Sequence, residues 1–320
     1  MPDVRSAPAR SREWVSAHVF HRGDLDRVLV EAVAPLAADL SAAGAVRSWF
    51  FLRYWEGGPH LRVRMRPASA AHTDEVRAAL LRRCGRYLDD HPGPQPPVEA
   101  LHAYGAAAAG WARAERLDAF DPHVRAGDCV ELVTYVPERS VYGVDDALAA
   151  AEAHFAESSA LALRLVAAGL PADRRRAVAL GLLMISLAVC EPRPERATAR
   201  LQHIARPVIG DRPVRQARQL WAGVNGTAPL GGELATWLQS VRTLHQHLVA
   251  GGIDGSFAPT DGRSPLGHLA ACAPPESRAV AAAVLRCTHL MFNRLGVHGG
   301  AEAQIAGMAA GALTDLEGRP

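Results

Sequence analysis

The stretch VRSWFFLRYWEGGPHLRVRMRP, residues 46–67, decides the fold of the first part of the chain. Its two arms are aromatic-rich or alternating, and Glu56-Gly57-Gly58-Pro59 between them is a turn sequence, so the stretch predicts a β-hairpin. In the second arm successive side chains point to opposite faces of the strand, and the two faces differ in chemistry. The ionisable set is His60, Arg62, Arg64 and Arg66, and the apolar set is Leu61, Val63 and Met65.

Segments on both sides of the hairpin carry further helix and strand signals. Residues 14–20 predict a strand, and residues 23–44 predict a helix that Asp24 opens and Gly44 closes. A second helix is expected over residues 71–90. Residues 91–100 are too rich in proline for a helix or a central strand, and residues 128–138 predict another strand.

From Gly143 onward the sequence is almost entirely helical in pattern. Helices are expected over residues 144–169, 172–190, 196–222, 231–250, 275–296 and 301–315. Residues 249–267 predict a long loop, either a lid or a mobile connection. Because the strands are few and lie in the first half, the fold class is α+β, with a small strand-rich N-terminal half and a mainly helical C-terminal half. No clear linker separates the halves, so residues 1–320 are expected to form a single domain with lobes 1–143 and 144–320.

Charge and composition exclude several classes of protein. All 35 basic residues are arginine, which indicates a GC-rich coding bias and makes the arginine count weak evidence for function. The net charge of +2 argues against a general nucleic-acid binder. No apolar run reaches the ~18 residues that a transmembrane helix needs. The first 14 residues are polar and predict a flexible N-terminus without a signal peptide, so we expect a cytoplasmic protein.

The chain lacks the usual cofactor and metal motifs. Its five cysteines are scattered without CxxC or zinc-ligand spacing, and we expect free, mostly buried thiols. GxGxxG, GxxxxGK[ST], HExxH and GxSxG are all absent. The sequence therefore implies neither a nucleotide nor a metal, and no cofactor is expected.

The arginines on one face of the second hairpin arm have two interpretations. Charges on an edge strand protect a sheet against aggregation, which would give them a solubility role. Like charges at every second position repel one another, however, unless an anionic or polar group faces them. Guanidinium groups also suit bidentate recognition of carboxylates and carbonyls. Periodicity alone leaves both interpretations open.

A second cluster lies in VTYVPERSVYG, residues 133–143. Tyr135 and Glu138 stand at the end of a predicted strand, and Tyr142 stands just before a helix. Active-site residues often lie at such strand ends. Ordinary turn chemistry at Pro137 and Gly143 explains the same stretch.

A third cluster lies in RCTHLMFNRLG, residues 286–296. His289 and Asn293 are four residues apart and share one face of a helix, so Asn293 is placed to orient the imidazole. A histidine of the helix core, satisfied by its neighbours, is the alternative.

Together the three clusters resemble one family. WFFLRYWEGGPHLRVR, TYVPERSVYG and HLMFNRLG occur in this order and at similar intervals in the thiopeptide-type biosynthesis domain. That domain is also the C-terminal glutamate-elimination domain of class I lantibiotic dehydratases. The opening segment, with its pattern W…F…D.L….V.PL….G, resembles the family as well. The resemblance therefore covers nearly the whole chain and implies the α+β fold of that elimination domain.

The resemblance implies two main activities. One group of members eliminates glutamate from glutamylated Ser or Thr to leave dehydroalanine or dehydrobutyrine. The pyridine synthases of thiopeptide pathways instead join two dehydroalanines of a modified precursor in a formal [4+2] cycloaddition, with loss of water and of the leader peptide as an amide. A third group, which ligates amino acids from tRNA to peptides, consists of far longer proteins. We expect a pyridine synthase, with glutamate elimination or a non-catalytic leader-peptide-binding role as the alternatives.

The resemblance also assigns site residues and partners. The family pattern YxxExxRYG falls on residues 135–143, and the histidine of eliminating members falls on His289. Arg53, on the partner strand of the hairpin, is expected to face the same region as the second arm. The expected partner is a precursor peptide, with a leader and a core that contains azoles and dehydroalanines. Other enzymes of the pathway are further candidates, and no nucleic-acid or membrane partner is expected. The catalytic candidates are His289, Tyr135, Glu138 and Tyr142, and the substrate-binding candidates are Arg53, His60, Arg62, Arg64 and Asn293.

One position departs from the family pattern. Val141 stands where the pattern has arginine, which removes a fixed cation and five hydrogen-bond donors. A site that stabilises a departing carboxylate should keep that cation. A site for a dehydrated, azole-rich peptide can lose it because this substrate is more apolar. Val141 therefore favours the pyridine-synthase hypothesis.

Overall fold

The computed structural model describes residues 13–115, 117–201, 211–261 and 264–317. The chain divides into two compact units, Met1–Pro137 and Glu138–Pro320. The division falls a few residues before Gly143, where the sequence pattern turns helical. Residues 1–12, most of the expected flexible N-terminus, lie outside the described residues. That both units belong to a single domain stays a prediction.

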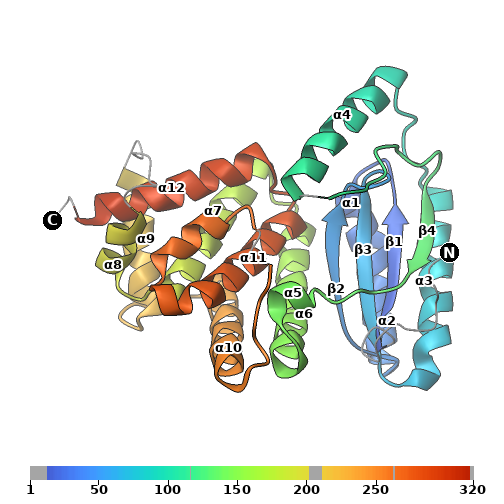
Figure 1. Ribbon diagram of the computed structural model, residues 1–320. Helices are drawn as coiled ribbons and strands as arrows, with labels where there is room; N and C mark the ends of the chain where they lie inside the picture. The colour runs from blue at the N-terminus through green and yellow to red at the C-terminus, as the bar shows by residue number, and fades with distance from the viewer. Residues whose placement is uncertain (1–12, 116, 202–210, 262–263, 318–320) are drawn as a thin grey trace. The chain divides into compact units, whose positions relative to one another are not determined.

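Unit 1 is built on a four-stranded antiparallel sheet with strand order β2-β3-β1-β4 (Figure 1). One face of this sheet packs on helices α2 and α3 and is apolar. Ala17, Val19, Leu61, Val63 and Met65 are fully buried on it, and each of the larger side chains contributes roughly 1.5–3 kcal/mol by burial. The elements of unit 1 are β1 (Val15–Phe20), α1 (Leu25–Arg27), η3 (Val28–Val33), α2 (Ala34–Ala42), β2 (Val46–Tyr54), β3 (His60–Pro67), η4 (Ala70–His72), α3 (Thr73–Asp90), α4 (Val98–Glu115) and β4 (Cys129–Val133).

The predicted hairpin is confirmed as β2 and β3, but its loop is one residue longer than the turn sequence indicates. Tyr54 pairs with His60, so the loop runs over residues 55–59. Gly58 N donates to Trp55 O at 2.9 Å, and Gly57 and Gly58 have φ of 74° and 113°. Glycine adopts such positive φ without the steric strain that other residues meet there. The fifth loop residue changes which side chains share a face, with consequences for the site.

The helix predicted over residues 23–44 is confirmed in outline. Asp24 caps it, accepting a hydrogen bond from Asp26 N at 2.8 Å. The segment passes through a π-helical turn, η3, between α1 and α2. Gly44 follows it with φ of 70°, the left-handed conformation that commonly ends a helix.

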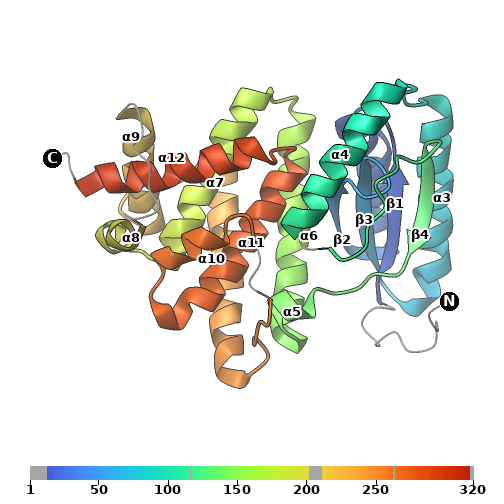
Figure 2. The same cartoon turned by 45° about the horizontal axis from the view of Figure 1, so that its top comes forward.

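Helix α4 was not predicted from the sequence. Its first three residues, 98–100, belong to the stretch that the prolines excluded from helix, and the alanine-rich part that follows carried no assignment. In unit 1 the helix lies beside the hairpin loop (Figure 2). Tyr104 Oη donates to Trp55 O at 2.6 Å, and Glu115 accepts from Tyr54 Oη at 2.7 Å. The predicted strand over residues 128–138 is also shorter than expected, since β4 ends at Val133.

Unit 2 consists of helices and loops without a strand in its described residues, as the sequence predicts. Helix α7 lies at its centre, and its residues 179–188 are all buried, as expected of a helix that is apolar on all sides. Helices α9, α10, α11 and α12 pack around it (Figure 1). The elements of unit 2 are α5 (Arg139–Tyr142), α6 (Asp145–Ala167), α7 (Ala172–Cys190), α8 (Pro194–Leu201), α9 (Asp211–Val224), α10 (Gly232–Asp254), η5 (Gly267–Cys272), η6 (Pro275–Ser277), α11 (Arg278–Arg294) and α12 (Gly300–Glu317).

Two segments of unit 2 differ in detail from the prediction. The helix expected over 196–222 corresponds to α8 and α9, and residues 202–210 between them lie outside the described residues. The long loop expected over 249–267 begins late, because α10 continues to Asp254 through two glycines. The residues that follow are bonded to the segment around α5: Val144 N donates to Ser256 O at 2.7 Å, and Thr260 N donates to Ser140 O at 2.8 Å. At Gly143, with φ of 78°, an added Cβ would lie 2.0 Å from Ser256 O, so only glycine fits.

The cysteine prediction is confirmed. All five thiols are free; Cys84, Cys190, Cys272 and Cys287 are buried, and Cys129 on β4 is half-buried. Among the described residues no single helix is long and apolar enough to cross a membrane; α7 and α8 reach that length and composition only together, across a bend of 102°.

Candidate functional site

The face of the sheet opposite α2 and α3 carries the ionisable side chains of β3. Pairing across the strands arranges this polar face in rows. Residues that pair directly in an antiparallel sheet lie on the same face and contact one another. From β2 to β4 the rows are Tyr54–His60–Phe20–Cys129, Leu52–Arg62–His18–Glu131 and Phe50–Arg64–Ser16–Val133.

The solubility interpretation of these arginines needs a strand that faces solvent. β3 is not an edge strand, since it lies between β2 and β1. The face is also largely withdrawn from water, since His60 is 1% and Arg64 9% exposed. Burying guanidinium groups costs free energy unless other groups face them. The burial therefore argues against a strand that faces solvent.

Aromatic rings hold the two central arginines. The Arg62 guanidinium lies 3.3 Å from the centre of the Tyr54 ring, and its Nη2 is 3.8 Å from the Glu56 carboxylate. The Arg64 guanidinium lies 5.8 Å from the Phe50 ring and 5.5 Å from the Tyr135 ring. Such cation–π contacts fix the position of a guanidinium and leave its edge N–H groups directed elsewhere.

His60 is held neutral within this face. Its Nδ1 lies 2.9 Å from Gly58 O, and because a carbonyl oxygen only accepts, Nδ1 carries the proton. Burial lowers the pKa of His60 to about 3, and the hydrogen bond to Gly58 only partly opposes this shift. Its Nε2 is buried and has no hydrogen-bond partner among the described residues.

The expectation that Arg53 faces the same region is wrong. Arg53 pairs with Leu61, not with Arg62, and therefore lies on the apolar face of the sheet. There its guanidinium forms an ion pair with Asp26 of α1. The five-residue loop is the cause, because a change of one residue in register moves every side chain of a strand to the opposite face.

Tyr135 joins the polar face of unit 1. It is 6% exposed and packs edge-on against Trp14 and Phe50, with ring centroids 5.7 and 6.0 Å apart. Glu138 and Tyr142 of the same predicted cluster belong to unit 2. The division of the chain between Pro137 and Glu138 therefore passes through this motif.

In unit 2, His289 of α11 is paired with a carboxylate. Its Nδ1 lies 2.8 Å from Glu302 Oε1 of α12, and the two side chains are 24% and 6% exposed. A carboxylate only accepts, so Nδ1 donates and Nε2 faces away from Glu302. This is the arrangement of a general acid–base histidine oriented by a buried carboxylate.

Glu302 orients the imidazole from a second helix, and the role expected for Asn293 stays a prediction. Asn293 stands one turn further along α11 and shares the face of His289, but the hydrogen bond to the imidazole comes from α12. The sequence contained no local signal for this pairing, since the two residues are 13 positions apart on separate helices.

Glu138 is paired with an arginine that the sequence analysis did not single out. Arg286 Nη2 of α11 lies 2.8 Å from Glu138 Oε2. Val141, where the family pattern has arginine, is 5% exposed. A guanidinium thus accompanies Glu138 even though position 141 is apolar. Arg286 and His289 are three residues apart on α11 and share one face of the helix.

Tyr142 is fully buried beneath this ion pair. Its ring meets Phe155 edge-on at 5.2 Å, and burial raises the pKa of its hydroxyl well above the usual value. A hydroxyl without solvent access does not contact a ligand directly. Its predicted catalytic role stays a prediction, and its burial favours a structural role.

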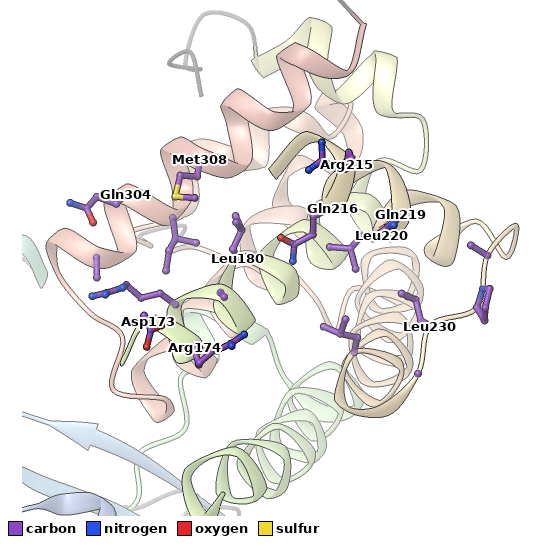
Figure 3. A pocket seen from close by; sticks show the side chains of 18 residues that line it. Asp173, Arg174, Leu180, Arg215, Gln216, Gln219, Leu220, Leu230, Gln304 and Met308 are labelled. Atoms are coloured by element: carbon purple, nitrogen blue, oxygen red, sulfur yellow. The ribbon is translucent and has the colours of Figure 1, made fainter. Parts of the chain in front are cut away.

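A groove in unit 2 contains none of these residues. Its volume is about 1140 Å³, and it lies between α7, α9, α10 and α12 (Figure 3). Leucines of α7 and α9 and Met308 give the groove an apolar part of its lining, and Arg174, Arg176 and Arg215 also line it. The predicted site residues therefore lie outside this groove. Within the described residues, no group of three or more His, Cys, Asp or Glu side chains is arranged to hold a metal ion.

Each unit thus offers one kind of chemistry. The polar face of unit 1 presents hydrogen-bond donors from Arg62 and Arg64, which suit carbonyl or carboxylate oxygens. Unit 2 presents an imidazole with a buried carboxylate partner, which suits proton transfer.

Comparison with solved structures finds the same fold in three proteins. "Pyridine synthase, TbtD, from thiomuracin biosynthesis" matches with a TM-score of 0.70 and 20% identity, over 96% of this chain and 99% of that one. TsrL matches with a TM-score of 0.63 and 18% identity, over 96% of each chain. The tRNA-dependent lantibiotic dehydratase MibB from Microbispora sp. 107891 matches with a TM-score of 0.53 and 19% identity, over 98% of this chain but 29% of that one.

No curated protein sequence matches this chain. The family described as "Lantibiotic biosynthesis dehydratase C-term" matches it over residues 14–313. That range begins at the first strand, ends in the last helix, and includes all of the candidate residues. The chain therefore belongs to the family of the C-terminal domain of lantibiotic biosynthesis dehydratases.

Proposed function

We propose that this protein is a pyridine synthase of a thiopeptide pathway. It would join two dehydroalanines of a precursor peptide in a formal [4+2] cycloaddition and then release water and the leader peptide as an amide. The central pyridine and the macrocycle form in the same sequence of steps. The likeness in fold to TbtD, which extends over 96% of this chain and 99% of that protein, supports the proposal. The likeness to the dehydratase MibB covers only 29% of that longer chain.

The apolar residue at position 141 is the observation that favours cycloaddition over glutamate elimination. Elimination must stabilise a departing glutamate carboxylate, and the family pattern has a guanidinium at this position. Here a buried valine replaces it, and the nearby Arg286 is already paired with Glu138. Each charge-assisted hydrogen bond to a carboxylate is worth roughly 1.5–3 kcal/mol. The loss of one should slow elimination by about ten-fold to a hundred-fold or more.

The polar face of unit 1 would supply binding in this reaction. Arg62 and Arg64 would hold peptide carbonyls and polarise the amide that becomes the azadiene. Holding diene and dienophile in register replaces a costly encounter between them, and this positioning would be the main source of rate. The pair of His289 and Glu302 would transfer protons during amide tautomerisation, loss of water and leader release.

Glutamate elimination is the second candidate function. The ion pair between Arg286 and Glu138 favours it, because a guanidinium stands near the position that lost its arginine. In that case Arg62 and Arg64 would bind the leaving glutamate and His289 would act as the base.

Two substrates offered in parallel distinguish the candidates. One is a leader-bearing precursor with glutamylated serines, and the other is the same precursor with azoles and dehydroalanines installed. We expect no glutamate loss from the first. From the second we expect a macrocycle and a leader amide, both detected by mass. Glutamate loss without cyclisation would favour elimination, and no change in either substrate would favour a leader-binding protein without catalysis. His289→Ala, which should be inactive, serves as the control for adventitious chemistry.

A further inference from the structure

The strand β1 contributes a histidine to the polar face that neither its sequence context nor the family pattern marks. His18 pairs with Arg62 of β3 on one side and with Glu131 of β4 on the other. It therefore lies in the row that holds Arg62, one of the predicted substrate-binding arginines. Pairing across an antiparallel sheet places its Cβ about 4.5–5.5 Å from that of each neighbour.

The imidazole of His18 is held by stacking. Its ring lies 4.7 Å from that of His60 at an interplanar angle of 30°, and 6.1 Å from that of Phe20. The side chain is half-buried. Neither ring nitrogen is hydrogen-bonded to another residue in the described part of the chain. The ring is thus fixed in position and keeps its hydrogen-bonding capacity.

The groups around His18 keep it neutral. Burial lowers the pKa of His18 to about 2, with His60, Arg62, Arg64 and Arg125 adding to the shift. The facing carboxylate of Glu131 does not offset them, because Arg125 Nε holds it at 2.9 Å. At neutral pH the ring therefore offers one N–H donor and one nitrogen lone pair. So weak a base does not take up protons during turnover, and hydrogen bonding is the role that remains.

A hydrogen-bond donor lies next to this ring. The Arg62 side chain is 23% exposed, so the outer N–H groups of its guanidinium can donate to a ligand that accepts hydrogen bonds. A carboxylate only accepts hydrogen bonds, so it would leave the lone pair of the imidazole without a donor. A peptide group carries both a carbonyl oxygen and an N–H. Its carbonyl oxygen can accept from a guanidinium, and its N–H can donate to the lone pair of a neutral imidazole.

We propose that His18 and Arg62 bind one backbone amide of the peptide substrate, with Arg62 donating to its carbonyl oxygen and His18 accepting from its N–H. This rests on the proposed function only in that the polar face binds the peptide; it does not depend on which reaction follows. His18 is then a substrate-binding residue, and its contribution is independent of pH across the neutral range.

Chemical footprinting of histidines and the substitution His18→Phe test this inference. Diethylpyrocarbonate modifies accessible neutral imidazoles, and peptide mapping by mass locates the product. We expect modification of His18 in the free protein and its protection when the leader-bearing, azole- and dehydroalanine-containing precursor is saturating. His18→Phe keeps the stacked ring but removes both nitrogens, and we expect KM to rise about ten-fold, or 1.4 kcal/mol, without loss of thermal stability.

His91→Phe is the matched control. The His91 ring also stacks on an aromatic neighbour, Tyr87, at 4.5 Å, but it lies outside the sheet. We expect wild-type kinetics from it. The inference would be overturned if bound precursor did not reduce the modification of His18. An unchanged KM in the His18→Phe variant would also overturn it. Protection of His18 without any macrocycle would support this inference and contradict the proposed function, so the two can fail separately.

Discussion

The pairing of His289 with Glu302 predicts that two substitutions of Glu302 will lower kcat to different extents. Glu302→Gln keeps an oxygen that accepts from Nδ1 but removes the negative charge, and Glu302→Ala removes the acceptor as well. A hydrogen bond to a charged group contributes about 1.5–3 kcal/mol and a neutral one about 0.5–1.5 kcal/mol. The glutamine variant should therefore lose about 1–2 kcal/mol of transition-state stabilisation, which is about 5- to 30-fold in kcat. The alanine variant should lose about 10- to 150-fold.

The loss should fall on kcat and not on KM. The Glu302 side chain is 6% exposed and contacts the imidazole, so it acts on the substrate only through His289. Product formation followed by mass, over a range of precursor concentrations, separates the two constants. Glu233→Gln makes the same substitution at an exposed position in the first turn of α10 and should leave both constants unchanged. If both Glu302 variants match the wild type, or if only KM changes, the imidazole does not need this carboxylate and the argument fails.

Further predictions concern binding, stability and cofactors. Arg62→Ala and Arg64→Ala should each abolish turnover in folded protein, whereas Arg47→Ala, at an exposed position of β2, should not; near-normal rates in the first two would remove the binding role. Burial lowers the pKa of His154 to about 3, below its unfolded value of about 6.5. As pH falls through this window the unfolded chain takes up the proton first, so the free energy of unfolding should fall by up to about 1.4 kcal/mol per pH unit. In the His154→Gln variant, the free energies of unfolding measured with denaturant at pH 5 and pH 7 should differ less than in the wild type. An equal difference in both proteins would show that His154 does not cause the pH dependence. The isolated leader should bind the full chain at about −8 kcal/mol, in the micromolar range, and equal processing of leaderless core would show that no such recognition exists. Activity should survive dialysis against a chelator with no nucleotide added; a need for metal, ATP or glutamyl-tRNA would refute this.

The sequence predicts those parts of the fold that local patterns determine. The alternation of residues 60–66 identified β3 and its two faces, and glycines identified the hairpin. It did not determine the loop length, because Trp55 is as compatible with a strand as with a loop. That one residue moved Arg53 to the apolar face. Helix α4 was missed because prolines precede it and no local pattern reveals the contacts, such as that of Tyr104 with Trp55, that stabilise it.

The candidate site follows the same rule. Residues that belong to a contiguous motif, such as Arg62 and Arg64, could be named from the sequence. Their partners from other elements could not, because tertiary packing alone brings them together. Glu302 reaches His289 from α12, Arg286 reaches Glu138 from α11, and His18 joins Arg62 through strand pairing. None of these has a spacing that a sequence pattern can detect.

The half-buried thiol of Cys129 gives the protein a built-in attachment point for a spectroscopic label. The other four thiols are buried, and burial raises the pKa of Cys84 and of Cys272 to about 12. Burial and the nearby Glu131 also raise the pKa of Cys129, so a reagent will couple slowly, but it will meet one accessible sulfur in the native state. Cys129 lies on the edge strand β4, in the row that contains His60 and Phe20. A fluorophore there would report peptide arrival in the unmutated protein, without engineered cysteines and without the lysine side chains that this sequence lacks.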